Sequence, residues 1–118
     1  MLGFPKQTEL LTKLMEVSEV RHRVISQNLA NVNTPGYTRL KVNFEDALSR
    51  EIMDGNVTGA QVAPEVTEDR QPPARADGNN VDVDLEIGEL QRNAMMYQTY
   101  SQLLASQFAT MRLAISSE

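Results

Sequence analysis

The sequence contains no cysteine and a single histidine, His22. Without cysteine the chain cannot form disulfides, thiolate metal sites or a cysteine–histidine catalytic pair. One histidine is also too few for nearly every histidine-based zinc site. His22 lies between Arg21 and Arg23, so we interpret it as part of a solvated helical face rather than as a ligand or a base. We therefore predict no catalytic residue, no cofactor and no bound metal.

Basic residues are too few for a nucleic-acid-binding surface. The 118 residues include 11 Lys and Arg against 16 Asp and Glu, a formal net charge of −5. Proteins that bind nucleic acid by neutralising phosphates need clustered positive charge, and the sequence has no basic run. We expect no nucleic-acid partner. The length suits one small domain, and we predict a single domain over residues 1–118.

Signals for secretion or membrane insertion are also lacking. The first twenty residues carry Glu9 and Glu16 and have no basic start followed by an apolar run, so they do not resemble a secretory signal peptide. Residues 93–111 are the longest stretch without a formal charge, but they include glutamines and several hydroxyl side chains, which are costly in a bilayer. We predict no cleaved signal peptide and no transmembrane segment.

Leucine, valine and isoleucine recur at three- and four-residue spacing over residues 5–33, which predicts a long amphipathic helix. Thr34 precedes Pro35, and a residue before proline is disfavoured in helical geometry. Pro35 and Gly36 suit the two central positions of a type II turn. We therefore predict that the helix ends there and that residues 34–42 form a turn.

The middle of the chain predicts a short helix followed by a flexible insert. Residues 43–53 combine a possible N-cap, Asn43, with acidic residues in the first turn and with Phe44 and Leu48 on one side. Residues 54–80 are punctuated by proline and glycine, which favours a loop or a weak hairpin.

The C-terminal segment, residues 82–116, predicts the longest helix. Acidic residues cluster at its start, where the helix dipole favours them. Alternating steps of four and three residues select an almost wholly apolar set, a heptad pattern typical of a coiled coil. Together with apolar positions of the first helix, the predicted seam comprises Leu10, Leu14, Ile25, Ile87, Leu90, Ala94, Tyr97, Leu104, Phe108, Met111 and Ile115.

The stretch from Asn93 to Met111 carries no formal charge, which is unusual for a solvated helix. Uncharged polar side chains can be buried with hydrogen-bond partners at modest cost, whereas unpaired charges cannot. We therefore expect other protein to surround this helix in its working state and to enclose Gln98, Gln102 and Gln107. The alternative is a monomeric hairpin in which the helix packs only on the first one.

Residues 28–37 read NLANVNTPGY. Asparagine tolerates left-handed geometry and its amide can bond the carbonyls that a helix end leaves free, so local chemistry alone explains this string as a helix stop. As a whole, however, the string resembles the signature that closes the N-terminal helix of flagellar rod, hook and hook-associated proteins. The predicted assembly motif comprises Asn28, Leu29, Ala30, Asn31, Asn33, Thr34, Pro35, Gly36 and Tyr37.

A second string resembles the proximal rod proteins within that family. Residues 77–82 read DGNNVD and are followed by an acidic helix start and by Tyr97-Gln98. The sibling rod protein FlgC shares the first signature but usually lacks this second one, so it remains an alternative. The resemblance covers roughly residues 5–53 and 77–116.

The resemblance implies an all-α fold, with long N- and C-terminal helices forming a coiled-coil hairpin, a short extra helix and an irregular or weakly β middle loop. It implies a non-enzymatic subunit of the periplasmic rod of the flagellar basal body, the drive shaft that transmits torque to hook and filament. The implied partners are further copies of the chain, the rod proteins FlgC, FlgF and FlgG, the adaptor FliE, the base of the membrane ring and the flagellar type III export apparatus.

Phe44 and Leu48 fit a Phe-x-x-x-apolar element that the export gate reads in early substrates of that apparatus, so the resemblance makes them a candidate export element. An apolar i,i+4 pair on a short amphipathic helix explains them equally well. The alternative function is a soluble helical adaptor or export chaperone, which would share a helical hairpin with apolar seams.

Overall fold

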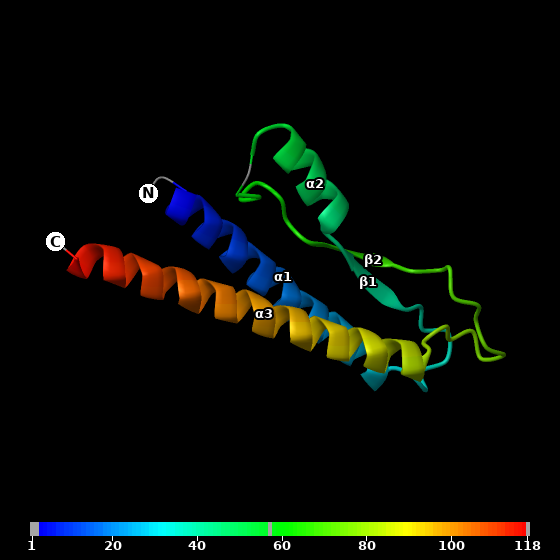
Figure 1. The fold of residues 1–118 in the computed structure, drawn as a ribbon. Helices are drawn as coiled ribbons and strands as arrows, with labels where there is room; N and C mark the ends of the chain where they lie inside the picture. The colour runs from blue at the N-terminus through cyan, green and yellow to red at the C-terminus, as the bar shows by residue number, and fades with distance from the viewer. Residues whose placement is uncertain (1–2, 57, 118) are drawn as a thin grey trace.

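The computed structural model describes residues 3–56 and 58–117, so Val57, in the predicted insert, lies outside the described residues (Figure 1). Along the chain, a shorter helix and two short strands lie between two long helices at its ends. In chain order the elements are α1 (Gly3–Ala30), β1 (Leu40–Asn43), α2 (Glu45–Met53), β2 (Glu65–Glu68) and α3 (Val83–Ser116).

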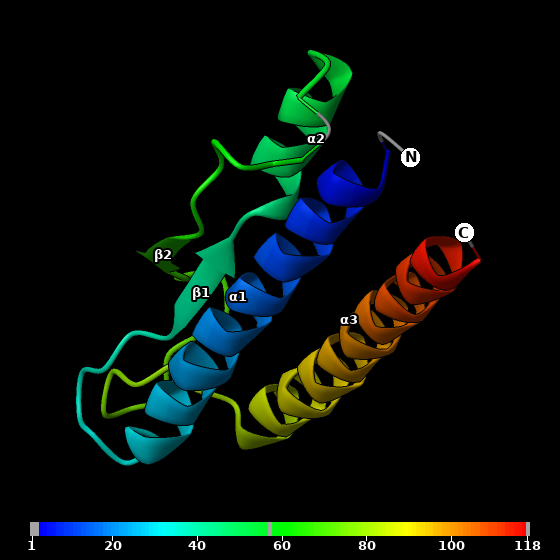
Figure 2. The ribbon, with the colours of Figure 1, turned by 90° about the vertical axis from the view of Figure 1, so that its left-hand side faces the viewer.

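The two long helices form an antiparallel hairpin. They run side by side, and the two chain termini lie at the same end of the molecule (Figures 1 and 2). Helix α1 is the central element, with α3 on one side of it and α2 and the strands on the other (Figure 2). The molecule is elongated, 67 × 28 × 14 Å. The prediction of a mostly helical chain with paired terminal helices is confirmed.

A two-stranded antiparallel sheet adds to the helices. Leu40 pairs with Glu68, and Asn43 pairs with Glu65. The sequence predicted only a turn over residues 34–42 and weak β structure further on, so β1 was not predicted. Four-residue strands are too short for a reliable alternation of apolar and polar side chains. The sheet depends instead on contacts between segments that are far apart in the sequence.

Asn43 does not cap α2, contrary to the prediction. It ends β1, where its Nδ2 donates a hydrogen bond to Thr67 Oγ1 at 2.8 Å. Phe44 takes the N-cap position of α2 and forms no capping hydrogen bond through its side chain. Pairing in the sheet thus keeps Asn43 one residue before the N-cap position.

A small apolar core holds α2 and the following loop against α1. It is centred on Val17, Phe44 and Val62, which are 1, 2 and 6% exposed. Burying such side chains contributes about 1.5–3 kcal/mol each. Gly59 has a φ of +65°, and a Cβ there would come within 2.5 Å of Leu48 Cδ1. A larger residue at this position would strain the left-handed backbone and force the Leu48 side chain to move.

The ends of the long helices depend on polar side chains. Helix α1 ends at Ala30, earlier than predicted, because Asn31 and Thr34 already form a hydrogen-bonded turn. Helix α3 is capped by Asp82, whose Oδ1 accepts hydrogen bonds from the backbone N–H of Asp84 at 3.0 Å and of Leu85 at 3.3 Å. In the part of the chain that the structure describes, no helix has the length and apolarity to cross a membrane.

Candidate functional site

The two sequence motifs meet where the hairpin is closed. The segment 28–40 leaves α1, the segment 75–86 leads into α3, and polar side chains of each bond to the other. We call this region the joint. Its main side chains are Asn28, Tyr37, Arg39, Asn79, Asn80 and Glu86.

Asn28 is fully buried and uses its whole amide in the joint. Its Nδ2 donates to the Leu40 carbonyl at 2.9 Å and to Glu86 Oε2 at 3.2 Å. Its Oδ1 accepts from the Leu40 N–H at 3.0 Å and from the Tyr37 hydroxyl at 2.8 Å. An asparagine amide offers two donors and two acceptor sites, and all four are used here. Asn28 therefore connects the end of α1 to β1 and to α3.

Glu86 is the buried acid of the joint, with 0% exposure. Arg39 Nε donates to Glu86 Oε1, and Arg39 Nη1 donates to Asp69 Oδ2 at 2.7 Å. Burial by itself lowers the pKa of Arg39, but hydrogen bonds and charges from Glu86 and Asp69 raise it overall above its ordinary value. A buried carboxylate is costly unless it is paired and hydrogen-bonded, so the position of Arg39 is tightly constrained.

The Tyr37 hydroxyl also responds to this buried acid. Burial, followed by the charge of Glu86, raises the pKa of Tyr37 above its ordinary value of 10.0. The phenol thus keeps its proton at neutral pH, and its hydroxyl donates a hydrogen bond to Asn28 Oδ1. This hydrogen bond fixes the side chains of Asn28 and Tyr37 relative to each other.

Asn79 and Asn80, in the second motif, form hydrogen bonds to the segment 28–40. Both are buried, with 0 and 7% exposure. Asn79 Nδ2 donates to the carbonyls of Asn31 at 2.8 Å and Thr34 at 2.9 Å, which belong to the turn that follows α1. Asn80 Oδ1 accepts from the Arg39 N–H at 2.6 Å. The DGNNVD segment therefore holds the turn that follows α1 in place.

Two glycines bring the backbones of the two motifs together. Gly36 and Gly78 both have left-handed backbone angles, with φ of 75° and 84°. A Cβ built on Gly78 would lie 3.3 Å from Gly36 Cα. The Gly36 N–H also donates to the Asp77 carbonyl at 2.8 Å. A side chain at Gly78 would meet both a strained backbone angle and a crowded contact.

The joint takes up much of the predicted assembly motif. Asn28, Asn31, Thr34, Gly36 and Tyr37 all take part in its hydrogen bonds. Leu29 is half-buried, and Ala30, Asn33 and Pro35 are exposed. Sequence reasoning did not single out Arg39, and it treated Glu86 only as one of the acidic residues at the start of the C-terminal helix. A search for apolar periodicity cannot find charged residues such as Arg39 and Glu86. Asn79 and Asn80, by contrast, belong to the DGNNVD string that the sequence analysis had already identified.

Helix α3 faces α1 with a mixed polar and apolar set of positions. Along this helix the buried or half-buried residues are Glu86, Glu89, Leu90, Asn93, Tyr97, Tyr100, Leu104, Gln107 and Met111. The predicted seam shares the Leu90, Tyr97, Leu104 and Met111 positions. The other α3 members of the predicted seam are exposed: Ile87, Ala94, Phe108 and Ile115. Three of them directly follow a residue that faces α1, namely Glu86, Asn93 or Gln107. On α1, Ile25 is buried, and Leu10 and Leu14 are half-buried.

Hydrogen bonds across the hairpin explain this offset. Asn93 Nδ2 donates to the buried Ser18 carbonyl at 2.7 Å. Further along, Gln107 Nε2 donates to Gln7 Oε1 at 2.8 Å, and the Thr8 hydroxyl donates to Gln107 Oε1 at 3.2 Å. Asn93 and Gln107 recur at the same heptad position as Glu86. Polar residues at such positions define register at a cost in stability, and a search for apolar residues passes over them.

The outer face of α3 is uncovered in this chain. Gln98 and Gln102 are exposed, whereas Gln107 is half-buried against α1. Large apolar side chains stand exposed among them: Met95 (69%), Leu103 (49%), Phe108 (48%) and Leu113 (70%). Exposed apolar patches of this kind mark interaction surfaces. The single chain thus presents an uncharged, partly apolar helix face to its surroundings.

The candidate export element lies in the core. Phe44 is 2% exposed and packs with Val17 and Val62, and Leu48 packs against this cluster. A receptor cannot reach the Phe44 ring on the folded chain. Any reading of this pair by an export gate therefore requires at least local unfolding of α2.

Comparison with known proteins gives concordant matches. Residues 20–38, the end of α1 and the following turn, match a family model described as "Flagella basal body rod protein". The flagellar basal body rod protein FlgB of Borrelia hermsii is 31% identical over 131 residues, which cover 95% of this chain and 97% of the relative. FlgB of Aeromonas hydrophila is 31% identical over 99% of this chain and 98% of the relative. FlgB of Bacillus subtilis strain 168 is 26% identical over 90% of each.

Proposed function

Because this chain belongs to the flagellar basal body rod protein FlgB family, as a structural subunit rather than an enzyme, we propose that it is one segment of the drive shaft that carries torque from the motor to hook and filament. The family resemblance inferred from the two sequence motifs is confirmed. The chain functions in the flagellar basal body with other rod components. The relatives favour neither the adaptor or chaperone alternative nor the sibling FlgC.

The observation that carries the drive-shaft proposal is the uncovered, uncharged face of α3. In the assembled rod, neighbouring subunits cover this face and enclose Gln98 and Gln102. Ile87, Phe108 and Ile115, exposed in the single chain, then pack in a coiled-coil seam with helices of those neighbours. Such heterologous contacts between different surfaces propagate as a helix without closing a ring.

The joint supports the mechanical part of the proposal. A shaft transmits torque only if its subunits resist deformation, and a two-helix hairpin is weakest where its ends are free to splay. Buried Asn28 and Glu86 tie α1, β1 and α3 together by side-chain hydrogen bonds at the closed end. The proposed assembly motif therefore acts by making each subunit rigid enough to be stacked.

The proposed route to the rod is export through the flagellar type III apparatus into the periplasm. Membership of the rod protein family supports this route. Phe44 and Leu48 serve as the export element while the chain is unfolded and become core residues after folding. The proposed partners are further copies, FlgC, FlgF, FlgG, FliE and the base of the membrane ring.

A fractionation experiment tests this function. A tagged copy replaces the chromosomal gene, and basal bodies are extracted in detergent and purified. We expect the chain to co-purify with the rod in a fixed ratio. A Leu103→Asp variant should be exported but should fail to join the rod, because it puts a charge on the α3 face that neighbours cover. A chain that remains in the cytosol would exclude the rod function and favour a chaperone.

A further inference from the structure

We propose that a groove between α1, α3 and β1 receives the C-terminal end of α2 from a second copy of the chain. The inference rests on the proposed assembly of copies into the rod, and it names one contact within that assembly. The groove has a volume of about 400 Å³. Its two distinguishing features are an apolar floor and unpaired positive charge on its rim.

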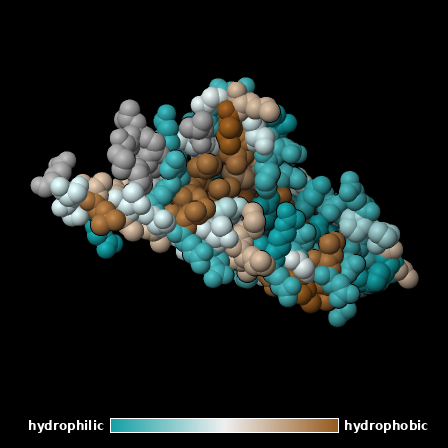
Figure 3. Space-filling view, in the orientation of Figure 1, coloured by the Kyte–Doolittle hydropathy of each residue, from teal (hydrophilic) through white to brown (hydrophobic). Residues whose placement is uncertain are grey.

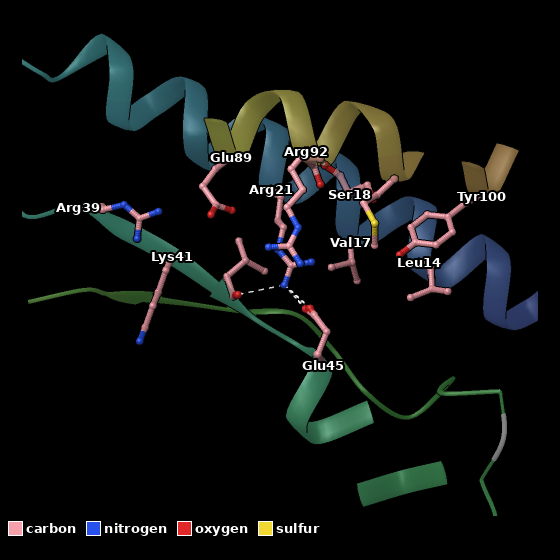
Figure 4. A pocket seen from close by; sticks show the side chains of 13 residues that line it. Leu14, Val17, Ser18, Arg21, Arg39, Lys41, Glu45, Glu89, Arg92 and Tyr100 are labelled. Atoms are coloured by element: carbon pink, nitrogen blue, oxygen red, sulfur yellow. Dashed lines mark hydrogen bonds and ion pairs between the residues drawn. The ribbon is translucent and has the colours of Figure 1, made fainter. Parts of the chain in front are cut away.

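The floor and walls come from three elements. Leu14 and Val17 of α1 and Met96 and Tyr100 of α3 supply apolar surface. Figure 4 shows Leu14, Val17 and Tyr100 around the opening, with Arg92 extending from α3 over it. The site is thus suited to an apolar side chain of moderate size that enters beside a charged rim.

The rim has more positive charge than the chain itself neutralises. Arg21 is paired with Glu45 and also donates to the Val42 carbonyl at 3.2 Å (Figure 4). Lys41, Arg92 and Glu89 also line the groove, and none of the three forms an ion pair with any residue that the structure describes. The two cations therefore outnumber the one carboxylate among these three. These two cations stand on a chain whose net charge is −5. A carboxylate of another copy is therefore attracted to this spot, although the copies as a whole repel each other.

The end of α2 carries the matching groups. Met53 is 86% exposed and Ile52 is 40% exposed. Asp54, the next residue, is exposed and forms no ion pair within residues 3–56 and 58–117. Its backbone is held by hydrogen bonds to the Arg50 and Ile52 carbonyls at the C-cap. An apolar side chain and a carboxylate are thus presented together on an ordered helix end.

The shape of the molecule also suits this contact. Figure 2 shows α2 rising past the N-terminal end of α1, so its C-terminal end projects from the body. In Figure 3 hydrophobic surface gathers over α2 and the neighbouring part of α1, and further hydrophobic areas lie toward the other end of the molecule. Met53 is flexible and polarisable, which suits it to filling an irregular apolar floor. Because the donor and acceptor surfaces differ, the contact is heterologous and repeats along a rod.

Cysteine cross-linking tests the contact directly, since the natural chain has no cysteine. Two tagged single-cysteine chains, Met53→Cys and Met96→Cys, are expressed in one cell, so that a disulfide between them must join two copies. Basal bodies are purified and oxidised with copper phenanthroline. We expect a cross-linked heterodimer for this pair. The matched control replaces Met96→Cys by Met95→Cys, an exposed neighbour outside the groove, and its yield should be at least about fivefold lower.

Charge reversal supplies the second test. Asp54→Lys or Arg92→Glu alone should lower the cross-link yield about two- to fivefold, the size expected of an exposed ion pair, and the two together in each copy should restore it. Chains that enter basal bodies but give no Met53–Met96 link, or reversals without effect, would overturn the contact and leave the rod function standing. Absence of the chain from basal bodies would instead overturn the rod function itself.

Discussion

Asn28 and Glu86 lie 58 residues apart in the sequence, both are 0% exposed, and Asn28 Nδ2 donates to Glu86 Oε2 at 3.2 Å. Asn28 lies in the last turn of the first helix of the hairpin, and Glu86 lies in the first turn of the second. The bond thus joins the two motifs by which the chain resembles other rod proteins. It also means that neither helix end is complete without the other.

Replacing Asn28 by aspartate should destabilise the folded chain strongly. Asn28→Asp removes the donor to Glu86 and places a second buried carboxylate beside the first. We expect a loss of about 3–5 kcal/mol in the free energy of unfolding, measured by urea denaturation followed by circular dichroism. Asn33→Asp is the control within the same motif, because Asn33 is exposed and its replacement should change stability by less than about 0.5 kcal/mol. Equal effects of the two variants would refute the assigned role of Asn28.

Alkaline pH should weaken the fold through Tyr37. Its pKa in the folded chain is raised above 10.0 by burial and by Glu86, so the folded state keeps a proton that the unfolded state loses first. This contribution to stability is complete below pH 10 and falls as pH rises through the folded pKa. Burial, chiefly, raises the pKa of Tyr100 as well, so both phenols act in the same direction.

The measurement for this prediction is the free energy of unfolding between pH 8 and 12, in the natural chain and in Tyr37→Phe. The variant should lose about 1 kcal/mol at neutral pH through the missing hydrogen bond to Asn28. It should then lose less additional stability than the natural chain above pH 10. Parallel curves for the two proteins would show that Tyr37 does not titrate as proposed.

Two glycine-to-alanine changes should have opposite effects. Gly78→Ala forces a side chain into a left-handed backbone and toward Gly36 Cα, so we expect a loss of about 1–3 kcal/mol. Gly88 lies inside α3 with nothing within 4 Å of an added Cβ, so Gly88→Ala should stabilise the chain by up to about 1 kcal/mol. Melting temperatures of the two variants compared with the natural chain would decide the matter. A Gly78→Ala protein as stable as Gly88→Ala would contradict the close contact.

The export role of Phe44 needs a substitution that spares the core. Phe44→Ala should cost about 3–5 kcal/mol because the ring packs with Val17 and Val62, so a fall in export would be confounded with degradation. Phe44→Leu keeps most of the apolar volume and should leave the intracellular amount nearly unchanged. If the gate reads the aromatic ring, periplasmic export of Phe44→Leu should nevertheless fall several-fold. Normal export of this variant would remove the proposed export element.

Sequence patterns predicted the long helices well. Apolar spacing in α1 and α3 extends over many turns, and Thr34-Pro35-Gly36 marks the end of the first helix region within a few residues. Asp82 at the start of α3 is likewise a local capping signal. Signals of this kind depend on neighbours close in the chain, so they can be read without a structure.

The face of α3 that meets α1 could not be read in the same way. Apolar residues alone place the seam at Ile87, Phe108 and Ile115, whereas the contact in the single chain includes Asn93 and Gln107 instead. A polar residue can occupy such a position only where a specific partner across the hairpin receives its hydrogen bond. For Asn93 and Gln107 that partner lies 75 and 100 residues away in the sequence, so local sequence patterns cannot identify it.

The chain's own residues determined its family, its helical class, the absence of formal charge from residues 93–111 and the two motifs at the joint. Tertiary structure alone decided that β1 exists, that Arg39 pairs with Glu86, and that Phe44 is a core residue. Each of these depends on groups brought together from distant parts of the chain. Helix periodicity is a short-range property of the backbone, whereas strand pairing and buried ion pairs form only when the whole chain has folded.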